Sequence, residues 1–133
     1  MSFSDKLITV SGGGSFGPGE NFKISLVLKD DAYFLKGKLE MVDELARKQK
    51  ETCRTVKVSK EWADGILNEL RSARIPLLPQ EVHGCDGDFY TMTVGSCFGG
   101  ATYSWWSEPP TGWEVLPKVT RQMTDLFSKE LPE

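Results

Sequence analysis

Two adjacent tryptophans, Trp105 and Trp106, constrain this chain more than any other sequence feature. Side chains alternate between the two faces of a β-strand, so neighbouring indoles on a strand must point in opposite directions. One ring can fill a core, and the other must face something else. The surrounding segment 99–113 holds three of the four tryptophans and no pattern typical of an active site, which indicates binding rather than catalysis.

The size and composition of the chain predict one globular domain, residues 1–133. A chain of 133 residues, 39% hydrophobic and 26% charged, can bury a single core. Its first residues show no basic patch followed by an apolar run, so we expect no signal peptide. Its apolar stretches are far shorter than a membrane span, so we expect a cytoplasmic protein without a membrane partner.

The charge is unevenly distributed along the chain. Residues 75–133 hold eight of the 19 acidic residues but only three of the 16 basic ones. This acidic half argues against a nucleic-acid partner, because phosphates require clustered lysine and arginine. It is compatible with a basic protein partner, and the alternative reading is that the imbalance only keeps the protein soluble.

Alternating apolar residues and turn residues predict a chain of short strands. The expected strands are 6–11, 22–28, 33–41, 52–58, 89–94 and 101–106. We expect Gly12–Asn21 to form a loop and Asp30-Asp31 a turn. The charged residues 43–51 have helical composition but little to bury, so a charged connection or frayed turn is expected there.

Two helices are predicted from apolar residues at three- and four-residue spacing. Ser59 is a suitable N-cap for the first helix, Glu61 suits its first turn, and Pro76 is expected to stop it. The second helix is expected from about Leu116 to Phe127, with Pro117 in its first turn. Together with the strands, these helices predict an α+β domain: a mostly antiparallel sheet of about five or six strands with two main helices packed on one face.

The last two strands are expected to form a hairpin that decides which tryptophan is buried. A two-residue turn at Gly99-Gly100 would place Val94 opposite Trp105 and drive Trp106 to the other face, beside Thr93 and Ser104. A one-residue slip would exchange the two indoles. The residues expected on the core side are Tyr90, Met92, Val94, Ala101, Tyr103 and Trp105.

The glycine pattern at Gly12, Gly14 and Gly17 resembles a nucleotide-binding loop only in its spacing. A dinucleotide fold needs a helix directly afterwards, whereas Pro18-Gly19 and a strand follow here. The segment is therefore interpreted as a flexible connection, with Phe16 at its tip as a candidate contact residue.

The three cysteines and the single histidine allow several readings. Cys53, Cys85 and Cys97 could bind zinc together with His83, although the paired spacing of a structural zinc site is missing. A cysteine–histidine nucleophile or a Cys85–Cys97 disulfide is also conceivable. Reduced, partly buried thiols in a cytoplasmic protein are the simpler interpretation, so no metal or cofactor is expected.

The candidate contact residues gather around the tryptophan-rich segment. Trp105 and Trp113 are expected to clamp the last helix against the sheet, which leaves Trp106 as the surplus aromatic. Asp86 and Asp88 could form a cation site or, more simply, a turn. The predicted partner-binding residues are Trp106, Glu108, Asp86, Asp88 and Phe16.

The order of elements and the phrase Tyr103-x-Trp105-Trp106-x-x-Pro109-Pro110-x-Gly112-Trp113 resemble small uncharacterised bacterial single-domain proteins, some of which lie in toxin–immunity loci. The resemblance implies a non-enzymatic, immunity-type inhibitor that binds and neutralises a toxin. The alternatives are a small enzyme or metal- or ligand-binding domain using His83, Cys85 and Cys97, and a homo-oligomer that buries Trp106 against its own copy.

Overall fold

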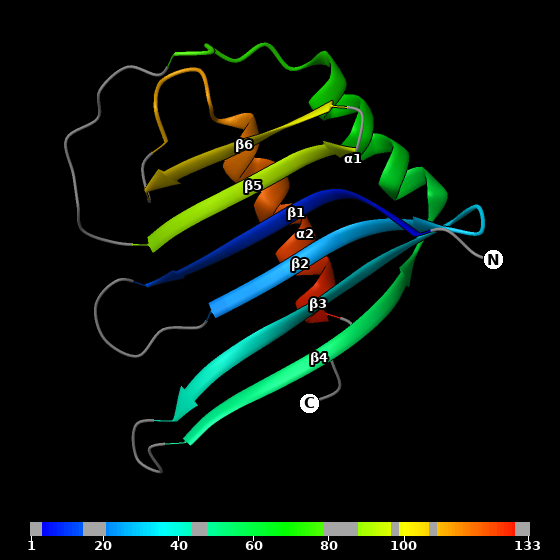
Figure 1. Ribbon diagram of the computed structural model, residues 1–133, viewed down its shortest axis with the longest axis vertical. Coiled ribbons are helices and arrows are strands. Elements are labelled where there is room, and N and C mark those ends of the chain that lie inside the picture. Colours follow the sequence, from blue (N-terminus) through cyan, green and yellow to red (C-terminus); the bar gives the residue numbers. More distant parts are fainter. Residues whose placement is uncertain are drawn as a thin grey trace.

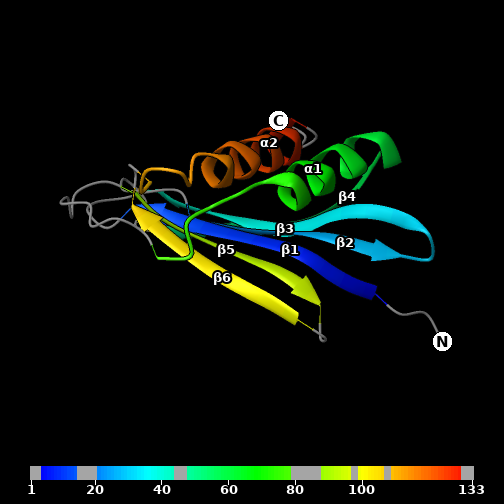
Figure 2. The ribbon, with the colours of Figure 1, turned by 90° about the horizontal axis from the view of Figure 1, so that it is seen from above.

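A computed structural model describes residues 4–14, 21–43, 48–78, 88–96, 99–106 and 109–129. Within these ranges, six antiparallel strands form one sheet in the order β4-β3-β2-β1-β5-β6 (Figure 1). Both helices lie on the same face of this sheet (Figure 2), so the predicted α+β fold is confirmed. The elements are β1 (Ser4–Gly14), β2 (Asn21–Lys29), β3 (Ala32–Asp43), β4 (Lys48–Val58), α1 (Lys60–Ser72), β5 (Asp88–Ser96), β6 (Gly99–Trp106) and α2 (Val115–Lys129).

The first four strands form an up-and-down meander, and β5 and β6 then extend the sheet on the other side of β1. The turn between β2 and β3 lies at Asp30-Asp31, as predicted, with φ values of 52° and 63°. Aspartate tolerates this left-handed conformation better than most residues, and such a two-residue turn matches the twist of a hairpin.

The prediction for residues 43–51 was wrong, because Lys48–Glu51 belong to a strand. Lys48 lies opposite Asp43 in the β3–β4 ladder, which continues without interruption to Val58 opposite Tyr33. The neighbouring strand β3 supplies backbone hydrogen-bond partners, and this tertiary context overrides the helical composition of the segment. Residues 44–47 lie outside the described residues.

The predicted glycine loop begins later than expected, because Gly12–Gly14 continue β1. Gly12 lies opposite Phe22 on one side and Tyr90 on the other. A Cβ atom at Gly12 would lie 2.6 Å from Cδ1 of Tyr90 and 2.9 Å from Cε1 of Phe22. The missing side chain therefore lets the two rings approach each other over the strand, with centroids 6.3 Å apart.

The hairpin of β5 and β6 has a different turn from the one predicted. Gly99 and Gly100 pair with Ser96 and Gly95 inside the ladder, so the turn is not at Gly99-Gly100. Trp105 consequently lies opposite Tyr90 instead of Val94. The shift along the strand is an even number of residues, so every side chain keeps its predicted face.

The start of α1 follows the sequence prediction. Ser59 has extended backbone geometry, and its side-chain oxygen accepts a hydrogen bond from the backbone N–H of Trp62 at 3.1 Å. The helix ends at Ser72, earlier than the proline stop predicted at Pro76. Ala73 is already extended, so the helix ends before the proline, which restricts only the residue directly preceding it.

The core lies between the helices and the covered face of the sheet. Trp105 and Trp113 are both buried, as predicted for residues that hold α2 against the sheet. Trp113 donates a hydrogen bond from Nε1 to the carbonyl oxygen of Pro76 at 3.0 Å, and its ring meets Tyr103 edge-on. The fully buried large side chains are Ile8, Val10, Ile24, Leu26, Leu35, Met92, Val119, Met123 and Phe127.

Candidate binding face of the sheet

The second face of the sheet is not covered by either helix (Figure 2). Strand alternation and the ladder register place two polar rows of side chains across it. From β6 to β4, the rows are Ser104, Thr91, Ser11, Lys23, Lys38 and Cys53, and then Thr102, Thr93, Thr9, Ser25, Lys36 and Thr55. We call this surface the open face.

Hydroxyl groups cover the β6–β5–β1 part of the open face and bond to one another across strands. The hydroxyls of Thr91 and Ser104 are 3.2 Å apart, and those of Thr93 and Thr102 are 3.1 Å apart. Both pairs are exposed to solvent. Such cross-strand pairs stabilise the register modestly and leave a smooth polar surface.

Lysines cover the β2–β3 part of the open face. Lys6, Lys23, Lys36 and Lys38 surround a shallow hollow of about 510 Å³ whose lining includes Ser25. The described side chains that line this hollow include lysines and no carboxylate, so the lining of the hollow is basic. A basic surface attracts anionic groups and is screened by salt.

An aromatic pair lies at one end of the open face, where β6 ends and β5 begins. Phe89 and Trp106 are cross-strand partners with ring centroids 5.0 Å apart at an interplanar angle of 59°. Phe89 is 40% exposed, and Trp106 is half-buried against it. We call these two residues the aromatic pair.

The structure places Trp106 on the predicted face but with a different neighbour. Its partner is Phe89, whereas Thr93 lies further along β5, opposite Thr102. The even register shift accounts for the difference, because it moves the contacts along the strand without moving them to the other face. Phe89 was missed as a contact residue, although its odd number places it on the same strand face as Thr91 and Thr93.

The other predicted contact residues are only partly covered by the structure. Asp88 is the first residue of β5, opposite Gly14 in the ladder. Phe16, Asp86 and Glu108 lie outside the described residues. Whether they join the aromatic pair therefore remains a sequence prediction.

The cysteine and histidine readings fall mainly outside the described residues too. His83, Cys85 and Cys97 lie outside the described residues, whereas Cys53 is exposed on β4. Among the described residues, no group of three or more His, Cys, Asp or Glu side chains could hold a metal ion.

Two leucines after α1 form a second exposed apolar feature that sequence reasoning missed. Leu77 is 95% exposed and Leu78 is 87% exposed. They directly follow Pro76, whose carbonyl oxygen is held by Trp113. No sequence pattern indicated this exposure, because a Leu-Leu-Pro sequence is equally typical of a buried connection.

Comparisons with protein-family models, curated proteins and solved structures found no match to this chain. Within the described part of the chain, neither helix combines the length and the apolar character needed to cross a membrane.

Proposed function

We propose that this chain is a non-enzymatic protein-binding domain that contacts its partner through the aromatic pair, Phe89 and Trp106. The observation that supports the proposal is the position of the pair on the open face, where no helix covers it and Phe89 is 40% exposed. Aromatic residues dominate the binding energy of many protein interfaces, because they bury a large area with few rotatable bonds.

The edge position of the pair supports the same proposal. Trp106 ends β6, which is an edge strand of the sheet. An edge strand has unpaired backbone groups along one side, and a second chain can pair with them by β-strand addition. A partner at this edge could contact both the indole and the strand backbone.

The finer proposal is an immunity-type inhibitor that neutralises a bacterial toxin in the cytoplasm. It rests on the sequence resemblance and on the acidic residues Asp86, Asp88 and Glu108, which flank the aromatic pair in the sequence. Carboxylates around an aromatic anchor suit a basic partner, because charge complementarity raises the association rate and excludes wrong partners.

The proposal is tested by using the protein as bait in extracts of its source organism. The wild-type chain is compared with Trp106→Ala, Glu108→Ala and Phe34→Ala, which removes an aromatic ring at a distance from the pair on the same face of the sheet. We expect wild type and Phe34→Ala to retain the same partner protein, and Trp106→Ala and Glu108→Ala each to weaken its binding by more than about 1 kcal/mol.

Equal retention by all four proteins would reject this surface as the binding site. Light scattering measures the oligomeric state of the purified chain and so detects a further outcome, in which a second copy of the chain covers the aromatic pair. In that case wild type is a dimer and Trp106→Ala is a monomer, and the proposal of a different partner protein fails.

A further inference from the structure

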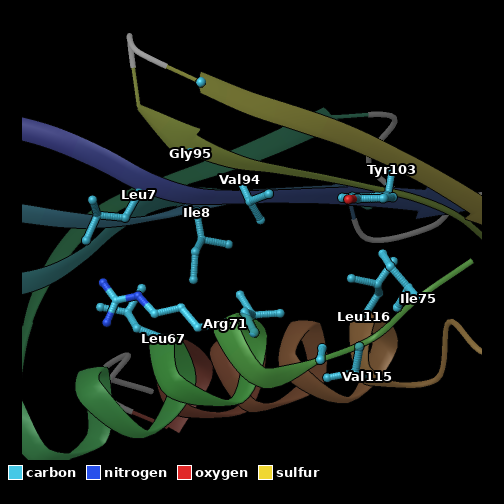
Figure 3. A pocket seen from close by; sticks show the side chains of 13 residues that line it. Leu7, Ile8, Leu67, Arg71, Ile75, Val94, Gly95, Tyr103, Val115 and Leu116 are labelled. Atoms are coloured by element: carbon cyan, nitrogen blue, oxygen red, sulfur yellow. The ribbon is translucent and has the colours of Figure 1, made fainter. Parts of the chain in front are cut away.

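A cavity lies between α1 and the end of the sheet formed by β1, β5 and β6 (Figure 3). Its volume is about 410 Å³, which is within the range of small-molecule sites in proteins. Side chains from both helices and from three strands line it. The lining residues central to its shape and polarity are Ile8, Leu70, Arg71, Gly95, Tyr103 and Leu116.

Glycines line the hairpin end of the cavity. Gly95 and Gly99 are both in its wall. Gly95 has a φ of +114°, and a Cβ atom there would lie 2.2 Å from the carbonyl oxygen of Gly99. A larger residue at Gly95 is therefore excluded by backbone strain and by contact with the paired strand β6, whereas a Cβ atom at Gly99 would meet no other atom within 4 Å.

The walls of the cavity are apolar except at two positions. Arg71, in the last turn of α1, is exposed and has its guanidinium at one end of the gap, near Leu7 and Leu67 (Figure 3). Tyr103 presents its hydroxyl from the sheet side. Within the described residues Arg71 has no ion pair and the Tyr103 hydroxyl makes no hydrogen bond.

We propose that this cavity binds a small amphipathic carboxylate, with its hydrocarbon part between the sheet and α1 and its carboxylate on Arg71. The charge of Arg71 selects the anion, because a guanidinium forms paired hydrogen bonds with a carboxylate. The apolar walls supply most of the binding free energy through buried hydrocarbon surface. The site is separate from the aromatic pair and does not depend on the proposed function.

The test uses decanoate as the probe and decanol as its uncharged counterpart. Binding of each to the full chain is measured by calorimetry, below the concentration at which either compound aggregates. We expect wild type to bind decanoate more tightly than decanol. Arg71→Gln is expected to weaken decanoate roughly fivefold and to leave decanol unchanged, because the exposed ion pair contributes only modestly.

Two variants control the interpretation. Arg74→Gln removes an exposed arginine that is not part of the cavity lining, and we expect unchanged binding of decanoate. Val94→Phe places a ring in the space that Val94 faces, and we expect binding of both probes to be lost while the protein remains folded. Circular dichroism and thermal unfolding establish the folded state of each variant.

Three outcomes would overturn the proposal. The first is that wild type binds neither probe at millimolar concentration. The second is that Arg71→Gln and Arg74→Gln weaken the binding of decanoate equally, which would show that Arg71 acts only through the overall charge of the protein. The third is that folded Val94→Phe binds decanoate as tightly as wild type, which would place the ligand outside the cavity.

Discussion

The two faces of one sheet differ in almost every physical respect. On the covered face, Val10, Ile24 and Leu35 have no exposed surface and pack beneath the two helices. On the open face, the same strands carry Lys23 and Lys36, which are exposed to solvent, and the hydroxyl residues Thr9 and Ser11, which are half-buried, while Ser25 is buried. From this comparison we expect stability to reside mainly on the covered face and the open face to accept substitutions and contacts without loss of the fold.

The largest expected difference between the faces concerns phenylalanine. Phe127 of α2 is fully buried over the covered face, and Phe89 is 40% exposed on the open face. We expect Phe127→Ala to lower the free energy of unfolding by about 3–5 kcal/mol, because it leaves a cavity. Phe89→Ala is expected to cost about 1 kcal/mol, mainly the contact with Trp106. Urea unfolding followed by fluorescence measures both values, and similar losses would contradict the comparison.

An isosteric exchange of valine and threonine sharpens the comparison without changing side-chain volume. Val10 has no exposed surface, so Val10→Thr buries a hydroxyl group on the covered face and should cost about 2 kcal/mol. Thr93→Val removes one exposed hydroxyl of the Thr93–Thr102 pair and should change the free energy of unfolding by less than about 0.5 kcal/mol.

The same urea unfolding measurement applies to this pair. A loss of more than 1 kcal/mol in Thr93→Val would show that the polar rows of the open face contribute to stability as the core does.

The smallest expected difference between paired variants concerns the helix that covers the sheet. Ser59→Ala removes the oxygen that accepts from the backbone N–H of Trp62, and we expect a loss of about 1 kcal/mol. Ser72→Ala is the matched control, because the Ser72 hydroxyl only donates to carbonyl oxygens in the last turn of α1. Thermal unfolding should show a lower midpoint for Ser59→Ala alone, and an equal shift in both variants would exclude capping as the cause.

Features that depend on neighbouring residues were predictable from the sequence. The Ser59 cap, the turn at Asp30-Asp31 and the start of α2 near Pro117 all follow from local backbone preferences. The division of Trp105 and Trp106 between the two faces is equally local, because it depends only on strand alternation. The two residues lie on opposite faces as predicted, even though the predicted position of the hairpin turn was wrong.

Features that depend on distant residues were not predictable. Lys48–Glu51 form a strand only because β3 lies beside them, and Phe89 reaches Trp106 only in the observed hairpin register. Of the aromatic pair, the sequence predicted Trp106 and missed Phe89, and the predicted contact residues Phe16, Asp86 and Glu108 lie outside the described residues. The cavity beside Arg71 brings together side chains from β1, β5, β6 and both helices, and no sequence pattern connects them.

The sequence alone determined both helices, the central part of each strand and the direction of their side chains, because caps, turns and alternation act over a few residues. Only the tertiary structure decided the order of the strands, the placement of both helices on the face opposite the open face, and the cavity between α1 and the sheet. These features arise from packing between segments far apart in the chain, and the energy of that packing depends on several segments at once, so no single stretch of residues predicts it.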